Sequence, residues 1–196
     1  MISTIKLLGT FLVAILLAHN AFAQSPVNMQ DSGNPEWIAQ CGKSGGYSAC
    51  ENLADQHFRG TGVPKNLRMT AYYLLKACRY GNMDMCAFSG KMANEQVNDM
   101  AIYGEALARL CEFSDPSNCT LVWSKFKDPK TPYYSPAFVG GALEKGCENG
   151  SGYACYLMAN WYDDYKLPPN VRMDANKASI GFQRTCMSEP SDKNMS

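Results

Sequence analysis

Histidine is scarce in this chain of 196 residues, and charge of neither sign is in excess. The sequence has two histidines, and 18 lysine and arginine residues balance 18 aspartate and glutamate residues. Balanced charge argues against a nucleic-acid-binding protein, which usually carries a basic excess, and against an acidic disordered tail. Because histidine is so rare, few residues are available for acid–base catalysis or metal binding. We therefore expect no nucleic-acid partner, no cofactor and no metal.

Long apolar runs are also missing, and the only notable one lies near the start of the chain. Leu7 to Ala18 is an apolar run of twelve residues, preceded by Lys6 and followed by Ala21-Phe22-Ala23. A positive start, a short apolar run and a small-x-small site are typical of a secretory signal peptide. As a membrane anchor the run is too short, since twelve residues make about 18 Å of helix against roughly 30 Å of hydrocarbon. We predict a signal peptide over 1–23, cleaved after Ala23, and a periplasmic or secreted protein without membrane insertion.

Cysteine, in contrast, is abundant and regularly spaced. The nine cysteines form two interleaved series: Cys50, Cys86, Cys119 and Cys155 in the first, and Cys41, Cys78, Cys111, Cys147 and Cys186 in the second. Successive members are 36, 33 and 36 residues apart in the first series and 37, 33, 36 and 39 apart in the second. A period in this range is typical of a solenoid built from helix pairs.

The residues around the cysteines repeat with helical spacing. Four positions before each second-series cysteine there is a bulky apolar residue: Trp37, Leu74, Leu107, Leu143 and Phe182. Seven positions before the last four of these cysteines there is a small residue: Ala71, Gly104, Gly140 and Ser179. After Cys50, a second helical face is formed by Leu53, Ala54 and His57 at offsets +3, +4 and +7. Such spacings put each set on one helix face, where we expect the bulky residues to fill the core. Each unit should therefore be a helix A, a turn and a helix B.

The fold class that follows is all-α, with almost no β-strand. We predict an α/α superhelix of about four helix-pair repeats with TPR-like architecture. The expected segments are a linker and partial leading helix at 24–45, repeats at 46–81, 82–114, 115–150 and 151–187, and a flexible tail at 188–196. Asn34-Pro35 and Ser135-Pro136 read as helix N-caps followed by proline, and Gly81 and Gly150 as glycines after helix ends.

Each close cysteine pair joins the end of one helix B to the start of the next helix A. An exported protein meets an oxidising compartment, so we predict disulfides Cys41–Cys50, Cys78–Cys86, Cys111–Cys119 and Cys147–Cys155. Zinc binding is the weaker alternative, because no Cys-x-x-Cys occurs and one histidine remains after signal cleavage. Cys186 has no downstream cysteine, and we expect it to be a free thiol, buried and inert rather than an intermolecular handle.

Three short stretches carry a family resemblance: Ala49-Cys50-x-x-Leu53-Ala54, Gly60-Thr61-Gly62-Val63 and Ala77-Cys78. They resemble Sel1-like repeats, and the Cys-x7-Cys pairs resemble the cysteine-rich Sel1-like proteins of the Helicobacter type. The resemblance covers roughly residues 35–187 and implies an α/α superhelix with four disulfide-closed repeats. It also implies a protein-interaction module. Some members are associated with penicillin binding or weak β-lactamase activity.

Motifs of catalysis are weak in this sequence, and we expect no catalytic residue. Gly42–Gly46 matches the G-x-S-x-G nucleophile elbow, but Ser44 should lie in a corner between helices rather than after a strand. The S-x-x-K pattern occurs at Ser3–Lys6, inside the predicted signal peptide. His57 stands on the core face of its helix, so a packed structural histidine is the favoured interpretation.

A binding function is therefore favoured, with a protein or peptide as the partner and the protein as a monomer. The alternative is a weakly β-lactam-hydrolysing, penicillin-binding or muropeptide-binding protein. Helices A of a solenoid offer an extended surface, and offsets +2 and +6 from the cysteine lie beside their core face. These positions hold Asn52, Gln56, Phe88, Met92, Leu121, Lys125, Leu157 and Trp161. We expect Phe88 and Trp161 to anchor the partner and Asn52 and Gln56 to orient it, unless some of these side chains pack between repeats.

Overall fold

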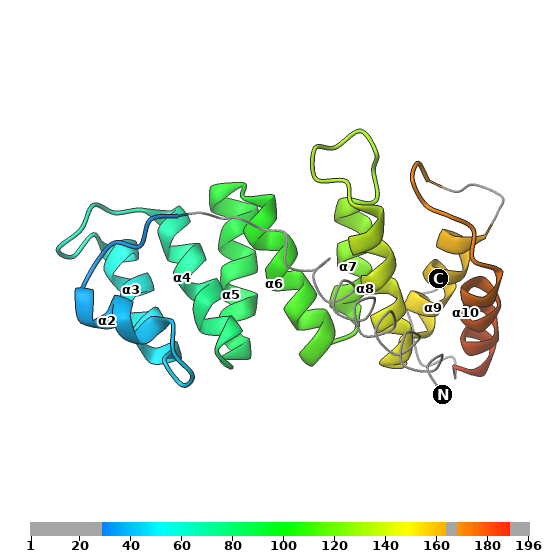
Figure 1. Ribbon diagram of the computed structural model, residues 1–196, viewed down its shortest axis with the longest axis horizontal. Helices are drawn as coiled ribbons and strands as arrows, with labels where there is room; N and C mark the ends of the chain where they lie inside the picture. The colour runs from blue at the N-terminus through cyan, green and yellow to red at the C-terminus, as the bar shows by residue number, and fades with distance from the viewer. Residues whose placement is uncertain (1–28, 164–167, 189–196) are drawn as a thin grey trace, which may run out of the picture.

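The computed structural model in Figure 1 describes residues 29–163 and 168–188. The predicted signal peptide at 1–23 and nearly all of the predicted tail at 188–196 lie outside the described residues. Within the described ranges the regular structure is helical and contains no strand. The elements are α2 (Pro35–Cys41), α3 (Tyr47–Arg59), α4 (Leu67–Arg79), α5 (Met83–Met92), the π-helix η2 (Ala93–Val97), α6 (Met100–Phe113), α7 (Ser117–Phe126), α8 (Pro136–Glu148), α9 (Gly152–Tyr162) and α10 (Ala175–Met187).

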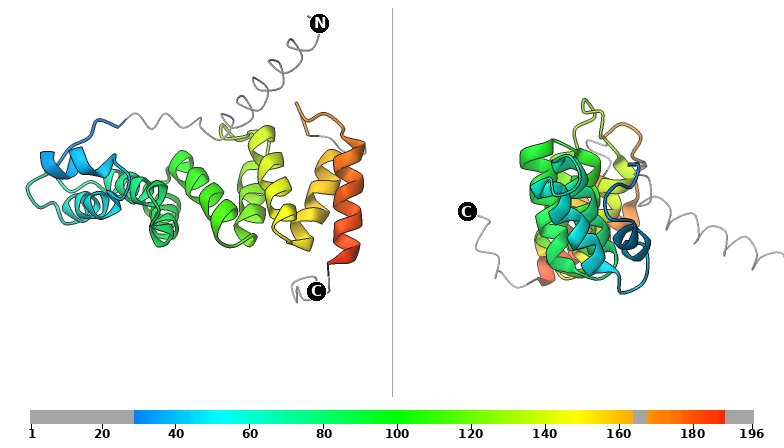
Figure 2. Two further views of the ribbon diagram at one scale, coloured as in Figure 1. Left: turned by 60° about the horizontal axis from the view of Figure 1, so that its bottom comes forward. Right: turned by 90° about the vertical axis from the view of Figure 1, so that its left-hand side faces the viewer.

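The helices stand side by side in a row along the long axis of the molecule (Figure 1). Helix α2 lies at one end of the row and α10 at the other, and the left view of Figure 2 shows the same succession from a second direction. Each helix packs against its neighbours in the chain, and α4, α6 and α8 also contact one another in succession. The predicted all-α solenoid of helix pairs is confirmed.

Local sequence signals set the ends of several helices. The side chain of Asn34 accepts hydrogen bonds from the backbone N–H groups of Glu36 and Trp37, which caps α2 as predicted. Ser135 caps α8 in the same way. Gly81 and Gly150 follow the ends of α4 and α8 with φ of 110° and 91°, backbone angles that side chains other than glycine rarely adopt. Each of these helix boundaries therefore follows from residues adjacent in the chain.

The second helix pair has the tight connection that its shorter repeat predicts. Helix α5 continues directly into the π-helix η2, and Asn98 then turns the chain with φ of 55°. The Asp99 side chain accepts hydrogen bonds from the N–H groups of Ala101 and Ile102, which begins α6. A π-helical turn is rare. Here η2 extends the first helix of the pair up to the turn at Asn98, so the two helices of the pair do not need a longer loop between them.

The core includes the helix faces that the +3, +4 and +7 offsets predict. On α3, Leu53, Ala54 and His57 are at most 2% exposed. On α6, Gly104 lies so close to α7 that an added Cβ would be 2.9 Å from Cζ of Phe126. A methyl group has no room at that distance, so glycine allows the aromatic ring to pack against the helix backbone.

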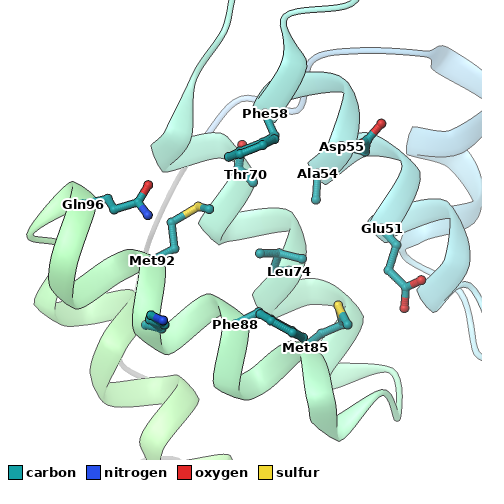
Figure 3. A pocket seen from close by; sticks show the side chains of 11 residues that line it. Glu51, Ala54, Asp55, Phe58, Thr70, Leu74, Met85, Phe88, Met92 and Gln96 are labelled. Carbon is teal, nitrogen blue, oxygen red and sulfur yellow. The ribbon is translucent and has the colours of Figure 1, made fainter.

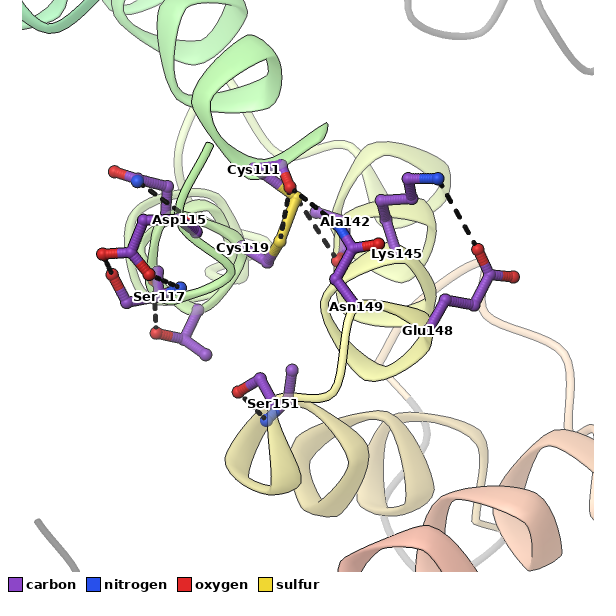
Figure 4. The surroundings of a disulfide bond; sticks show 12 residues. Cys111, Asp115, Ser117, Cys119, Ala142, Lys145, Glu148, Asn149 and Ser151 are labelled. Carbon is purple, nitrogen blue, oxygen red and sulfur yellow. Dashed lines mark hydrogen bonds and ion pairs between the residues drawn. A yellow bond between two sulfur atoms is a disulfide. The ribbon is translucent and has the colours of Figure 1, made fainter. Parts of the chain in front are cut away.

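Four disulfides close the corners between successive pairs, and they are the four pairings expected. They are Cys41–Cys50, Cys78–Cys86, Cys111–Cys119 and Cys147–Cys155. Figure 4 shows the third corner, where the Asn149 side-chain amide donates to the carbonyl oxygen of Cys111 at 3.2 Å. Cross-linking a loop of about nine residues is worth roughly 2.5 kcal/mol in the loop-entropy description.

The expectation for the last helix is wrong in two respects. Cys186 is a free thiol, but it is exposed rather than buried. Phe182, expected in the core, is 41% exposed. Helix α10 packs on α9 through Ala178 and Gly181, where an added Cβ at Gly181 would lie 2.8 Å from Ala159. The face bearing Phe182 and Cys186 is a different one, and no described helix covers it.

Candidate functional site

An apolar groove lies between α3 and α5, the first helices of two successive pairs, with α4 as its floor (Figure 3). Its volume is about 490 Å³, within the roughly 300–1,000 Å³ range of ligand pockets. The lining residues are Glu51, Ala54, Asp55 and Phe58 of α3, Thr70 and Leu74 of α4, Met85, Phe88, Lys91 and Met92 of α5, and Gln96 of η2.

Helical periodicity explains why these side chains meet. On α5, Met85, Phe88 and Met92 are spaced i, i+3 and i+7, so they share one face. On α3, Glu51, Asp55 and Phe58 are spaced i, i+4 and i+7 and share a face on the other side of the groove. The groove is therefore formed by opposite sides of two equivalent helices, and different cysteine-relative offsets line its two walls.

The walls expose large apolar side chains to solvent. Phe58 is 44% exposed and Phe88 is 59% exposed, on opposite sides of the groove in Figure 3, with half-buried Leu74 between them. The Nζ atom of Lys65 lies 5.4 Å from the centroid of the Phe58 ring, in cation–π contact. An apolar surface of this kind is a typical site for a partner or ligand.

Charged residues of the groove differ in what they already bind. Glu51 accepts a hydrogen bond from the Asn82 side-chain amide. Asp55 forms an ion pair with Arg59, with 2.7 Å between Oδ1 and Nε. Lys91 is exposed and forms no ion pair within the described residues. Asp55 is thus neutralised by an ion pair and Glu51 accepts a hydrogen bond from a neutral amide, whereas Lys91 has no ion-pair partner among the described residues.

Four of the eight residues at the +2 and +6 offsets neither line the groove nor belong to the core: Asn52, Gln56, Leu121 and Lys125. Phe88 and Met92 do line it. Asn52 and Lys125 are exposed but outside it, Asn52 on α3 and Lys125 on α7. Gln56 lies on another side of α3, where its Oε1 atom accepts a hydrogen bond from the backbone N–H of Asn34 at 3.0 Å. Gln56 does hold a peptide backbone, but that backbone belongs to this chain.

Leu157 and Trp161 were expected at the partner surface, and this prediction is wrong. They are 6% and 5% exposed, respectively, and belong to the core. Trp161 packs against α8 at Gly140, where an added Cβ would be 3.4 Å from its Nε1 atom. The Nε1–H group has no hydrogen-bond partner among the described residues. Helix α9 therefore turns its +2 and +6 positions inward, unlike α5.

A second cluster fastens the segment before α2 onto α3 and α4. The Tyr73 hydroxyl accepts a hydrogen bond from the N–H of Ser32 and donates one to its carbonyl oxygen, both at 3.0 Å. Nε2 of His57 lies 2.8 Å from the same oxygen, and Lys76 pairs with Asp31 at 2.9 Å. Burial raises the pKa of the Tyr73 hydroxyl, so the group stays protonated and able to donate. His57 is thus a packed structural histidine, as predicted.

The described residues around Ser44 do not form the nucleophile elbow that its sequence motif resembles. Ser44 is exposed in the turn between α2 and α3, and the described residues place no strand before it. His57 hydrogen-bonds to Ser32 instead of Ser44. Among the described residues, no group of three or more histidine, cysteine, aspartate or glutamate side chains is placed to hold a metal ion. No helix in the described ranges is long and apolar enough to cross a membrane.

Two proteins are among the solved structures to which this chain is similar. A Sel1 repeat protein from Oxalobacter formigenes is 17% identical with a TM-score of 0.42, covering 89% of this chain and 72% of that protein. A protective antigen of uropathogenic Escherichia coli with an SLR fold is 16% identical with a TM-score of 0.36, covering 76% of this chain and 39% of the antigen. No family description and no curated protein sequence matches the chain. The row of helix pairs with four corner disulfides nevertheless fits a cysteine-rich Sel1-like repeat protein.

Proposed function

We propose that this chain is an exported repeat scaffold that binds a protein or peptide partner through the groove between α3 and α5. Phe88 carries the proposal, because it is 59% exposed beside Met92 and Leu74 in an apolar groove. Burying such a side chain against a partner is worth roughly 1.5–3 kcal/mol. Phenylalanine and methionine are also enriched in protein interfaces.

The disulfides support a binding role by holding the groove in shape. Cys41–Cys50 joins the start of α3 to α2, and Cys78–Cys86 joins α5 to the end of α4. Each wall of the groove is thus tied covalently to a neighbouring helix. A preorganised surface binds more tightly because less conformational entropy is lost when the partner arrives.

Export is proposed from two independent features. Four disulfides are typical of proteins in an oxidising compartment such as the periplasm or the extracellular space. The predicted signal peptide at 1–23, cleaved after Ala23, would deliver the chain there. The proposed repeats at 46–81, 82–114, 115–150 and 151–187 would then form disulfides as they fold.

The test is site-specific photocrosslinking with a matched control. A benzophenone amino acid is placed at Phe88 in one variant and at Phe113 in the other. Phe113 is 58% exposed but lies at the end of α6, outside the groove. We expect a discrete crosslinked partner in the native cell envelope from position 88 and none from position 113. Identical crosslinks from both positions, or none from either, would refute groove binding.

A further inference from the structure

We propose that the groove recognises an acidic–apolar peptide segment: a bulky apolar side chain enters between Phe58 and Phe88, and a neighbouring carboxylate pairs with Lys91. This inference rests on the proposed function and adds the chemistry of the partner to it. It follows from the apolar walls, from the charges around them and from which of those charges are already engaged.

The apolar part of the segment follows from the shape of the groove. Phe58 and Phe88 flank it, and Leu74 forms part of its floor (Figure 3). A volume of about 490 Å³ is larger than one side chain needs, so the groove can hold a bulky anchor together with part of its backbone. Met85 and Met92 complete the wall, and flexible thioether side chains adapt to different apolar shapes.

The acidic part follows from the unpaired cations. The ammonium group of Lys91 borders the groove without an ion-pair partner among the described residues. The ammonium group of Lys65 adds positive charge 5.4 Å from the Phe58 ring. A carboxylate on the partner can reach Lys91 without breaking any contact of the free protein. Complementary charge of this kind sets which partner is accepted more than how tightly it binds.

A basic segment is disfavoured by the contacts of the two acidic residues. The Asn82 amide engages one oxygen of Glu51, Oε1, without neutralising the charge of that carboxylate. To pair with Asp55, a partner cation must compete with Arg59, whose Nε atom lies 2.7 Å from the carboxylate. A partner cation could therefore reach Asp55 only by breaking an ion pair, and Lys91 would repel that cation anywhere in the groove, which leaves Glu51 as its one available acid.

The experiment is selection of peptides from a random displayed library on the oxidised full-length protein. We expect the enriched peptides to combine an aromatic or bulky aliphatic residue with an aspartate or glutamate within three positions. With Lys91→Glu as the immobilised protein, the enriched charge should switch to lysine or arginine. Lys130→Glu is the control, since Lys130 is exposed in the loop between α7 and α8, away from the groove.

Binding of one enriched synthetic peptide is then measured by fluorescence anisotropy. Lys91→Glu should weaken it roughly fivefold or more, because an exposed ion pair becomes a repulsion, and rising salt should reduce the difference. Phe88→Ala should weaken it at least tenfold, and Phe113→Ala should not.

The outcomes separate the two proposals. Peptides that need Phe88 but show no acidic preference, or that ignore Lys91→Glu, overturn the acidic–apolar assignment and leave groove binding in place. Peptides that bind equally to the Phe88→Ala variant place binding elsewhere and overturn both. Failure to enrich any peptide also overturns both.

Discussion

Trp161 should be a structural anchor of the last helix pair, and Phe88 a surface residue that the fold does not need. Trp161 is 5% exposed and Phe88 is 59% exposed. Replacing a buried tryptophan by alanine removes its contacts and leaves a cavity, which costs about 3–5 kcal/mol. Replacing the exposed Phe88 by alanine should change the free energy of unfolding by less than about 0.5 kcal/mol.

A third variant, Trp161→Phe, separates lost packing from the polar group of the indole. The buried Nε1–H has no hydrogen-bond partner among the described residues, and a group in that state costs about 1–3 kcal/mol. Phenylalanine removes this cost while retaining an aromatic ring against Gly140. We therefore expect Trp161→Phe to lose less than half of the stability that Trp161→Ala loses.

The measurement is urea denaturation followed by far-UV circular dichroism, with hydrogen exchange to locate the effect. In a solenoid each repeat contacts only its neighbours, so faster exchange in the Trp161→Ala variant should concentrate in α8, α9 and α10. The reasoning fails if Trp161→Ala is within 1 kcal/mol of the parent protein, or if Phe88→Ala is destabilised as strongly. Loss of partner binding with intact folding in Trp161→Ala would restore Trp161 as a contact residue.

Two further predictions concern the disulfides and the segment before α2. The double replacement Cys111→Ala and Cys119→Ala opens a loop of about nine residues and should lower the free energy of unfolding by roughly 2.5 kcal/mol. At about 2–4 °C per kcal/mol, the melting temperature measured by calorimetry should fall by about 5–10 °C. An unchanged melting temperature would show that this disulfide is dispensable. Gly33→Ala should loosen the segment before α2, because φ of Gly33 is 125° and a Cβ would lie 2.6 Å from Oε1 of Gln56. The backbone strain is worth about 1–3 kcal/mol. Amide hydrogen exchange at Ser32 as slow as in the parent protein would contradict this prediction.

Features that depend on nearby residues could be predicted from the sequence. The cap of α2 at Asn34 involves neighbours two and three residues away. The disulfides join cysteines eight or nine positions apart, and these recurring short separations can be seen directly in the sequence. The core face of α3 follows from helical periodicity alone, because a helix fixes the relative directions of its own side chains.

Features that depend on the neighbouring helix could not be predicted. Offset +2 places Phe88 of α5 in an open groove but buries Leu157 of α9, and offset +6 places Met92 in the groove but buries Trp161. The cysteine-relative spacing is the same in both helices and does not predict this difference in exposure. It arises from what packs beside each helix, and for α9 that includes α8, whose Gly140 lies against the indole Nε1 of Trp161.

The sequence by itself determined the all-α class, the register of the helix pairs and the cysteines that meet at each corner, because these rest on periodicity and short-range contacts. Only the tertiary structure decided which sides of α3 and α5 form the groove, that Lys91 has no ion-pair partner among the described residues, and that Ser32 is held by His57 and Tyr73 from 25 and 41 residues away. These properties depend on surfaces brought together from different helices. Side-chain direction within one helix is local, whereas exposure and pairing belong to the whole packed array.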